Sequence, residues 1–339
     1  MEIKRDYDLT GLNTLAVVAK AKFFVVLEKA SDIVELFSRS EFKGNKRFFL
    51  GGGSNVLFLN DFDGIVVQNK LKGIDIISED DVSVRVKMMG GEDWHEAVLF
   101  CVNKNYWGIE NLSLVPGSVG AAPIQNIGAY GTELKDTLES VEVYDVESGE
   151  KRILALSECK FGYRDSIFKN SAKGKCLISA INLKLSKIPK PNISYKILKD
   201  YLEKNNISSP SLKEISDAVC QIRRSKLPDP KVIPNAGSFF KNLLVDSAVI
   251  GSLKEKYPDM PTFKDDSGVT KISTAWLIEQ CGWKGKREGR VGMHERQALV
   301  LVNYGGATGE EIIAFAKKII ASVEEKFKLA IVPEVNIIE

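Results

Sequence analysis

Short apolar and alternating runs dominate the first half of the chain and predict strands. An apolar run ending at Leu50 leads into the glycine-rich segment Gly51–Asn55 and resumes directly after it, as expected for a strand, a tight turn and a second strand. One segment, Asp93 to about Asn103, instead carries apolar residues at helical spacing, which predicts a helix. Strands are predicted at 47–50, 56–59, 82–86 and 140–145.

Helical patterns are clearer in the second half of the chain. A capping box at 211–214 predicts a helix that continues to about Arg224. Another capping box at 308–311 precedes a long amphipathic segment, which predicts a second helix. The apolar tail at 329–335 predicts a final strand.

Length and charge limit the classes of protein to consider. With 339 residues, of which 44% are hydrophobic, the chain can build two or three cores. Lys and Arg number 47 against 45 Asp and Glu, so no global basic field is available for nucleic acid. The apolar runs are too short to span a membrane, and the first residues lack a signal-peptide core. We therefore expect a cytoplasmic protein that binds neither nucleic acid nor membranes.

The cysteines and histidines do not form a recognisable reactive motif. His95 and His294 each precede a glutamate, but neither segment has the second histidine of a zinc-protease helix. The scattered cysteines contain no C-x-x-C pair and predict reduced, mostly buried residues rather than disulfides or a metal site. These cysteines are Cys101, Cys159, Cys176, Cys220 and Cys281.

The segment Val115–Gly131 has an unusual composition. It contains four glycines and two prolines, and no charged residue lies between Glu110 and Glu133, although 27% of the chain is charged. Glycines allow a ligand to approach the backbone, and backbone N–H groups can bind its polar atoms. The pattern therefore favours a ligand-binding loop, while an apolar connector buried between layers remains the alternative.

Gly51–Asn55 is a second glycine-rich segment, and it fits either a phosphate-binding loop or a hairpin turn. A Rossmann fingerprint is disfavoured because Val56 stands where G-x-G-x-x-G needs glycine. The chain also has no G-x-x-x-x-G-K-[ST] sequence, which disfavours a P-loop.

Five motifs in order along the chain resemble one enzyme family over essentially its whole length, the UDP-N-acetylenolpyruvoylglucosamine reductases. Any one of them alone would be a weak signal. They are LGGGSN at 50–55, VPGSVGAAPIQNIGAYG at 115–131, FGYRDSIFK at 161–169, NAGSFFKN at 235–242 and PEV at 333–335.

This resemblance implies an α+β fold of three subdomains. Two would form a vanillyl-alcohol-oxidase-like (PCMH-type) FAD-binding fold, at 1–70 together with the tail 330–339, and at 71–206. The third, at 207–329, would be an α/β domain that binds a UDP-sugar. Tyr195, in an intact segment 187–206, places the chain with the longer, first subtype of the family.

The family's activity implies a specific substrate and donor. Bound FAD, held non-covalently and reduced by NADPH, would reduce UDP-N-acetylglucosamine enolpyruvate to UDP-N-acetylmuramate, a peptidoglycan precursor. Arg164 matches a catalytic arginine suited to a carboxylate. Ser238 matches the proton donor. Glu334 matches a catalytic glutamate, which needs a raised pKa to act beside a developing anion.

The resemblance also carries over binding residues. Phe263 stands where relatives carry tyrosine, which puts one phosphate contact in doubt. FAD-binding residues are expected at Gly51, Gly52, Gly53, Ser54, Asn55, Pro116, Gly117, Ser118, Gly120, Ala121, Ile124, Gln125, Asn126, Ile127, Gly128 and Ala129, with Gly117, Ser118 and Gly120 nearer the phosphates. Substrate-binding residues are expected at Tyr195, Lys226, Asn242, Lys284 and Gln297.

Two other functions remain as alternatives. A related flavin oxidase or dehydrogenase would need a different substrate domain, and NAGSFFKN together with PEV argues against it. A nucleotide-sugar-binding protein without catalysis would not need Arg164, Ser238 and Glu334 together. For the favoured reading we expect a monomer whose partners are NADPH and the UDP-sugar, without a metal.

Overall fold

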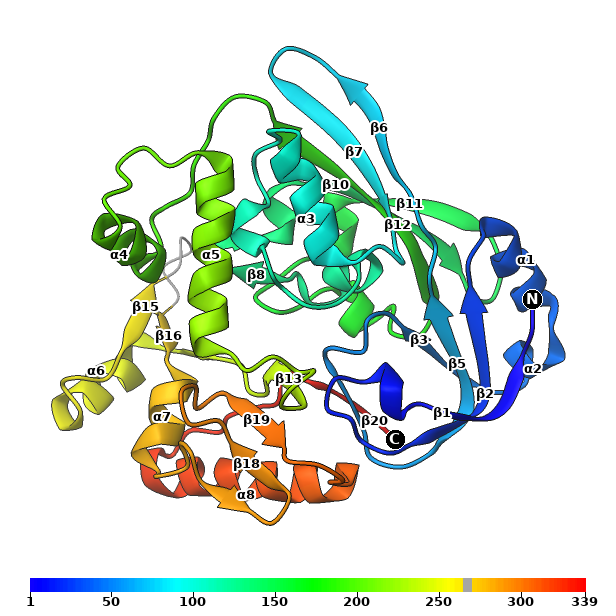
Figure 1. The fold of residues 1–339 in the computed structure, drawn as a ribbon. Coiled ribbons are helices and arrows are strands. Elements are labelled where there is room, and N and C mark those ends of the chain that lie inside the picture. The colour runs from blue at the N-terminus through cyan, green and yellow to red at the C-terminus, as the bar shows by residue number, and fades with distance from the viewer. Residues whose placement is uncertain (265–269) are drawn as a thin grey trace. The chain divides into compact units, whose positions relative to one another are not determined.

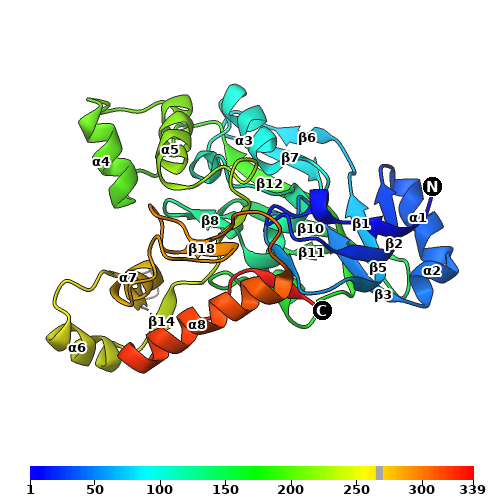
Figure 2. The same cartoon turned by 60° about the horizontal axis from the view of Figure 1, so that its bottom comes forward.

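The computed structural model (Figures 1 and 2) describes residues 1–264 and 270–339. Its contacts divide the chain into two compact units. Unit 1 comprises residues 1–7, 21–53 and 62–225, and unit 2 comprises 8–20, 54–61 and 226–339. The three-subdomain division at 70/71 and 206/207 differs from this grouping and remains a prediction.

The first sheet of unit 1 is parallel at its centre and has the order β1-β2-β5-β3. Strand β5 pairs in parallel with β2 on one side and β3 on the other. Apolar residues of β2 and β5, including Val25 and Val67, share a core with Ile33 and Leu36 of α1 and Phe42 of α2. The elements are β1 (Lys4–Asp8), β2 (Lys20–Leu27), β3 (Lys46–Leu50), β5 (Phe62–Asn69), α1 (Ala30–Ser38) and α2 (Ser40–Lys43).

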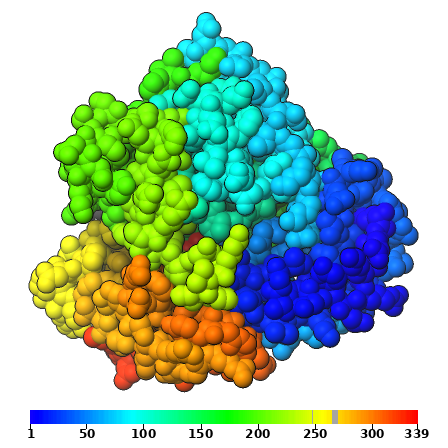
Figure 3. Space-filling model, viewed as in Figure 1, coloured from blue at the N-terminus to red at the C-terminus, as the bar shows by residue number. Residues whose placement is uncertain are grey.

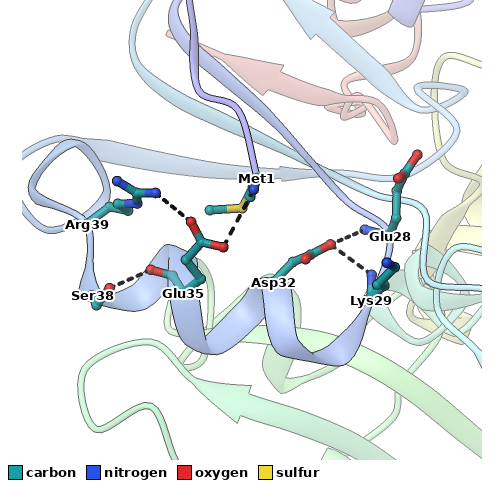
Figure 4. A network of polar contacts seen from close by, with 7 residues as sticks. All are labelled: Met1, Glu28, Lys29, Asp32, Glu35, Ser38 and Arg39. Carbon is teal, nitrogen blue, oxygen red and sulfur yellow. Dashed lines mark hydrogen bonds and ion pairs between the residues drawn. The ribbon is translucent and has the colours of Figure 1, made fainter.

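Polar contacts stabilise both ends of α1 (Figure 4). The carboxylate of Asp32 accepts from the backbone N–H groups of Glu28 and Lys29, each at 2.9 Å, and so binds amides at the start of the helix. Glu35 pairs with Arg39 one turn later and with the amino group of Met1 at 3.6 Å. These contacts join the N-terminus of the chain to the helix.

The second sheet of unit 1 is antiparallel and has the order β11-β10-β12-β7-β6. Apolar residues on one of its faces share a core with three helices, α3, α4 and α5. In the space-filling view the green stretch of chain that contains α4 and α5 lies beside the cyan stretch that contains α3 (Figure 3). The strands are β6 (Ile74–Glu79), β7 (Ser83–Met89), β10 (Leu138–Asp145), β11 (Lys151–Ala155) and β12 (Cys176–Ser186). The helices are α3 (Trp94–Asn103), α4 (Lys196–Lys204) and α5 (Leu212–Lys226). The short strands β8 (Gly128–Ala129) and β9 (Thr132–Glu133) form a separate hairpin.

Unit 2 combines small sheets with a long helix. One sheet has the order β13-β19-β18-β17, another β14-β16-β15, and β4 pairs in parallel with β20. Its strands are β4 (Val56–Phe58), β13 (Asn235–Ser238), β14 (Leu243–Val245), β15 (Thr262–Lys264), β16 (Thr270–Ile272), β17 (Arg287–Glu288), β18 (Val291–Met293), β19 (Val300–Asn303) and β20 (Asn336–Ile338). Its helices are α6 (Ser247–Lys256), α7 (Thr274–Gln280) and α8 (Gly309–Phe327).

The structure confirms the three helices that the sequence predicts. Asp93 accepts from the backbone N–H of Glu96 at the start of α3, at 3.0 Å. Reciprocal capping bonds of Ser211 with Glu214 and of Thr308 with Glu311 start α5 and α8. The predicted strands at 47–50, 56–59, 82–86 and 140–145 correspond to β3, β4, β7 and β10.

The strand predicted at 329–335 is wrong, because the final strand β20 begins only at Asn336. Leu329, Ile331 and Val335 are buried in the core of unit 2, so packing explains their apolar character without a strand. Pro333 has no N–H to donate to a ladder and makes only an isolated bridge with Phe240.

The described cysteines carry free thiols, and Cys101, Cys159 and Cys220 are buried, as expected. Within residues 1–264 and 270–339, no helix is long and apolar enough to cross a membrane.

Candidate functional site

Two glycine-rich segments of unit 1 lie directly against each other. A Cβ atom added at Gly51 would lie 2.2 Å from the Oγ atom of Ser118, and one added at Gly52 would lie 2.9 Å from the Cα atom of Gly117. Both distances are too short for a side chain, so glycine is required on steric grounds. The structure therefore brings together two segments in which the sequence predicts FAD-binding residues.

Ser118 contributes an unsatisfied polar group to this contact. Its Oγ atom is buried and has no hydrogen-bond partner among the described residues. The neighbouring backbone is well bonded, with Trp94 N donating to Gly117 O at 3.0 Å and Val119 N donating to Glu92 O at 2.9 Å. An unpaired buried hydroxyl is costly, and a phosphate oxygen is a partner it could bind. These residues fit the diphosphate of a dinucleotide cofactor.

The rest of the uncharged loop is partly a packed connector. Val119, Ala122 and Ile127 belong to the core of unit 1, and a Cβ atom at Gly120 would lie 3.0 Å from the Cα atom of Gly90. Packing therefore explains much of the absence of charged residues from this loop, which agrees with the alternative interpretation of the segment as a buried apolar connector. Asn126 is buried with φ of 43°, and its amide nitrogen donates to Glu133 at 2.9 Å.

Arg164 is held in a tight turn. Gly162 and Asp165 exchange backbone hydrogen bonds at 3.0 and 3.3 Å, and Arg164 between them has φ of 52°, an uncommon conformation for arginine. Its guanidinium donates to the carbonyl of Gly128 in β8, and a Cβ atom at Gly128 would lie 2.8 Å from its Nη1 atom. A side chain at 128 would therefore displace the arginine.

Aromatic and cationic side chains gather beside this turn. The rings of Tyr130 and Tyr195 meet edge to face with centroids 5.5 Å apart. Arg223 of α5 donates from Nε to the carbonyl of Leu114 at 3.1 Å and also hydrogen-bonds the Tyr130 hydroxyl. Burial raises the pKa of Tyr195, and the positive charge of Arg164 acts in the opposite direction. Arg164, Tyr195 and Arg223 thus belong to one cluster in unit 1.

In unit 2, the main chain brings together the segments that carry Ser238 and Glu334. Ser238 ends β13, and the carbonyl of the next residue, Phe239, accepts from the backbone N–H of Glu334 at 2.7 Å. Phe239 and Phe240 are fully buried and pack edge to face, which anchors this crossing. Ser238 and Glu334 themselves are half-buried.

The expected substrate-binding residues of unit 2 differ in how far they are already engaged. The side-chain oxygen of Asn242 accepts from Thr274 N at 3.1 Å, and Gln297 makes a longer contact of 3.4 Å with Leu299 N. Lys284 pairs with Glu279 at 2.8 Å on the surface, as an ordinary solvated lysine does. Lys226 ends α5, and burial lowers its pKa.

Other expected site residues are placed as follows. Ser54 and Asn55 follow Gly53, but belong by their contacts to unit 2, where Asn336 N donates to Asn55 O at 3.1 Å. Phe263 lies in β15 and is 49% exposed, which leaves its ring available at the surface.

Sequence reasoning did not single out Tyr130 or Arg223. A signal for Arg223 is present in the sequence, because it follows Val219 by four residues and Ile215 by eight, on the buried face of α5. An arginine on the apolar side of a helix needs a polar partner or a role.

Two family models match parts of this chain. Residues 229–338 match the family model described as the C-terminal domain of UDP-N-acetylenolpyruvoylglucosamine reductase, and residues 21–154 match one described as an FAD binding domain. The UDP-N-acetylenolpyruvoylglucosamine reductase of Flavobacterium johnsoniae is 46% identical over 339 residues, and that of Amoebophilus asiaticus 44%, each covering 100% of both chains.

A solved structure shows the same fold. The crystal structure of UDP-N-acetylenolpyruvylglucosamine reductase from Thermus caldophilus matches 100% of both chains with a TM-score of 0.70 and 21% sequence identity. The α+β fold with an FAD-binding part and a distinct C-terminal domain is therefore established. With relatives of this similarity over its full length, the chain belongs to the UDP-N-acetylenolpyruvoylglucosamine reductase family.

Proposed function

We propose that this protein is an FAD-dependent oxidoreductase that uses NADPH to reduce UDP-N-acetylglucosamine enolpyruvate to UDP-N-acetylmuramate, a peptidoglycan precursor. Full-length similarity to reductases named for this substrate supports the proposal. The structural observation that carries it is the backbone bond from Glu334 to Phe239, which puts two expected catalytic segments side by side. We propose further that the protein is a monomer and acts in the cytoplasm.

The residues that would hold FAD are the two glycine-rich segments. The backbone N–H groups of these loops and the unpartnered hydroxyl of Ser118 would donate to its diphosphate. The lack of charge in this loop means that backbone and hydroxyl dipoles, rather than lysines, would bind the cofactor. Bound FAD supplies the hydride for the substrate's double bond.

Arg164 would bind the substrate carboxylate. Adding a hydride to the enolpyruvyl double bond moves negative charge toward that carboxylate, and a guanidinium can bind both of its oxygens. The bond to Gly128 and the turn at 162–165 fix the side chain before substrate arrives. Preorganisation of this kind lowers the cost of stabilising the developing charge.

Ser238 would donate a proton from Oγ to the substrate carbon next to the carboxylate. A serine hydroxyl is a weak acid, so its contribution depends on its orientation and on resupply of the proton. Glu334 would act as a protonated acid that donates a hydrogen bond to the intermediate. Its ionised form would repel the developing anion, so the role requires a raised pKa.

Lys226, Lys284, Asn242, Gln297 and Tyr195 would bind the UDP portion. A diphosphate carries two negative charges, which the two lysines can match. Lys284 must exchange its surface partner Glu279 for the ligand, so its contribution should be the smaller of the two.

The proposal is tested with the purified protein, its visible absorption spectrum and an NADPH oxidation assay. A flavin spectrum, with oxidation of NADPH that depends on the enolpyruvyl UDP-sugar, is the expected result. A protein without flavin that oxidises no NADPH would contradict it. Oxidation that ignores the UDP-sugar and depends only on oxygen would instead identify an oxidase.

A further inference from the structure

Arg223 is a partly buried cation whose hydrogen-bond partners in unit 1 are all neutral groups. Its Nε atom donates to the carbonyl of Leu114 at 3.1 Å, and its guanidinium hydrogen-bonds the hydroxyl of Tyr130. No ion pair joins it to an acidic side chain within the part of the chain that the structure describes. A guanidinium has five N–H donors, so two neutral acceptors leave donors available.

The surroundings of Arg223 make its positive charge unfavourable without an anion. Burial lowers the pKa of Arg223, and repulsion by the positive charge of Arg164 acts in the same direction. Both arginines bind the same short stretch of chain, Arg164 at Gly128 and Arg223 at Tyr130. A partly buried guanidinium without an acidic partner favours the binding of an anion, and Arg223 by itself meets this condition.

The anchor of Arg223 is itself fixed. Leu114 has φ of 58°, a strained value for leucine, and its N–H donates to Nδ1 of His95 at 3.0 Å while its carbonyl accepts from Arg223. His95 and Arg223 therefore hold both backbone groups of this residue. Because the acceptor of its Nε atom is fixed, the other guanidinium nitrogens of Arg223 are held in a defined orientation.

The nearest hairpin does not supply the missing anion to Arg223. Glu133 of β9 lies across from Gly128, but its carboxylate pairs with Lys135 at 2.9 Å and accepts from Asn126 at 2.9 Å. Among the described residues Arg223 therefore has no acidic partner, and its charge is available to an anionic ligand.

We propose that Arg223 is a further substrate-binding residue and that, together with Arg164, it holds one oxyanion of the ligand. This inference rests on the proposed function, which supplies a ligand with a carboxylate and a diphosphate. Both groups present oxygens that a guanidinium binds well. Tyr130, which contacts both Arg223 and Tyr195, then orients the guanidinium rather than neutralising it.

The test measures binding by calorimetry with the full-length protein and two probes. UDP-N-acetylglucosamine carries the diphosphate only, and UDP-N-acetylglucosamine enolpyruvate carries the carboxylate as well. The variant is Arg223→Gln, and the matched control is Arg224→Gln, because Arg224 is the exposed neighbour on the same helix. A charged hydrogen bond contributes enough that losing it should weaken binding about 10- to 100-fold, while the control stays near wild type.

The two probes identify the group that is bound. Weaker binding of both by Arg223→Gln assigns Arg223 to the diphosphate, and weaker binding of the enolpyruvyl compound alone assigns it to the carboxylate. Arg223→Lys keeps the charge and should recover part of the affinity, and it decides the matter if the Gln variant does not fold.

The thermal midpoint without ligand, measured beside the affinities, separates binding from a structural role. Losing the bond to Leu114 should lower the midpoint of Arg223→Gln, but a purely structural role would leave the affinity of the folded protein for both probes unchanged. A lowered midpoint with wild-type affinity for both probes would overturn the inference and show that Arg223 only supports Leu114. A wild-type protein that binds neither probe would overturn the proposed function as well.

Discussion

The backbone N–H of Glu334 donates to the carbonyl of Phe239 over 2.7 Å, although 95 residues separate them in the chain. Because Phe239 directly follows Ser238, the bond places Glu334 beside the segment that carries Ser238. Phe239 is fully buried, so the crossing is fixed by the core of unit 2 rather than by the polar side chains themselves. Replacing the side chain of Ser238 or Glu334 should therefore leave the fold of unit 2 intact.

This arrangement predicts different effects for two substitutions of Glu334. Glu334→Gln keeps a hydrogen-bond donor of similar shape, whereas Glu334→Leu keeps only the volume. If the protonated acid donates to the intermediate, the Leu variant should lose about 10²- to 10³-fold in kcat, and the Gln variant clearly less. Equal loss of kcat in both variants would argue against a donor role.

Gly52 should be essential for cofactor retention. A Cβ atom there would lie 2.9 Å from the Cα atom of Gly117, so Gly52→Ala forces the two loops apart. We expect the purified variant to contain much less flavin per protein than the wild type, as measured by absorbance. Gly11→Ala is the control, since nothing lies within 4 Å of a Cβ atom at that position. Full flavin content in Gly52→Ala would remove these loops from the cofactor site.

His95 should make the protein less stable in mild acid. Burial lowers its pKa, and its neutral Nδ1 accepts from Leu114 N. The unfolded chain therefore binds a proton near pH 6.5 that the folded protein resists. The stability due to neutral His95 is present above that pH and decreases as the pH falls below it.

The measurement for His95 is the thermal midpoint at pH 7.5 and at pH 5.5. His95→Asn offers an acceptor that does not titrate, so the difference between the two midpoints should shrink. Burial also lowers the pKa of His294, which is present in both proteins. His294 therefore contributes equally to the pH dependence of the midpoint in both. Parallel pH profiles for the two proteins would show that His95 does not contribute.

Gly237 should matter for stability because of its backbone conformation. Its φ is 68°, and a Cβ atom there would meet nothing within 4 Å, so only the backbone opposes a side chain. Gly237→Ala should cost about 1 kcal/mol in the free energy of unfolding. Gly251→Ala in α6 has the same open space without a positive φ and should instead stabilise the protein by up to ~1 kcal/mol. Chemical denaturation measures both, and the same sign for both would contradict the argument.

Local chemistry explains which parts of the fold were predictable. The capping boxes of α5 and α8 and the helical spacing of apolar residues in α3 are local features, so the sequence alone reveals these helices. The tail at 329–335 misled because burial against the core of unit 2 and strand pairing produce the same apolar pattern.

Contacts that join distant segments were beyond prediction from the pattern. The approach of Gly52 to Gly117 and the bond between Glu334 and Phe239 depend on the complete fold. Family resemblance supplied the expected site residues, but it did not reveal that Arg223 and Tyr130 join Arg164 and Tyr195 in one cluster.

The most direct test of the proposed mechanism compares wild type with Ser238→Ala in two half-reactions, reduction of the flavin by NADPH and reduction of the enolpyruvyl UDP-sugar. The absorbance of the bound flavin monitors both. The account predicts that NADPH reduces the flavin of both proteins at similar rates. It also predicts that Ser238→Ala consumes the enolpyruvyl UDP-sugar about 10²- to 10⁴-fold more slowly, because the proton donor is missing. Equal slowing of both half-reactions, or no slowing with the UDP-sugar, would contradict it.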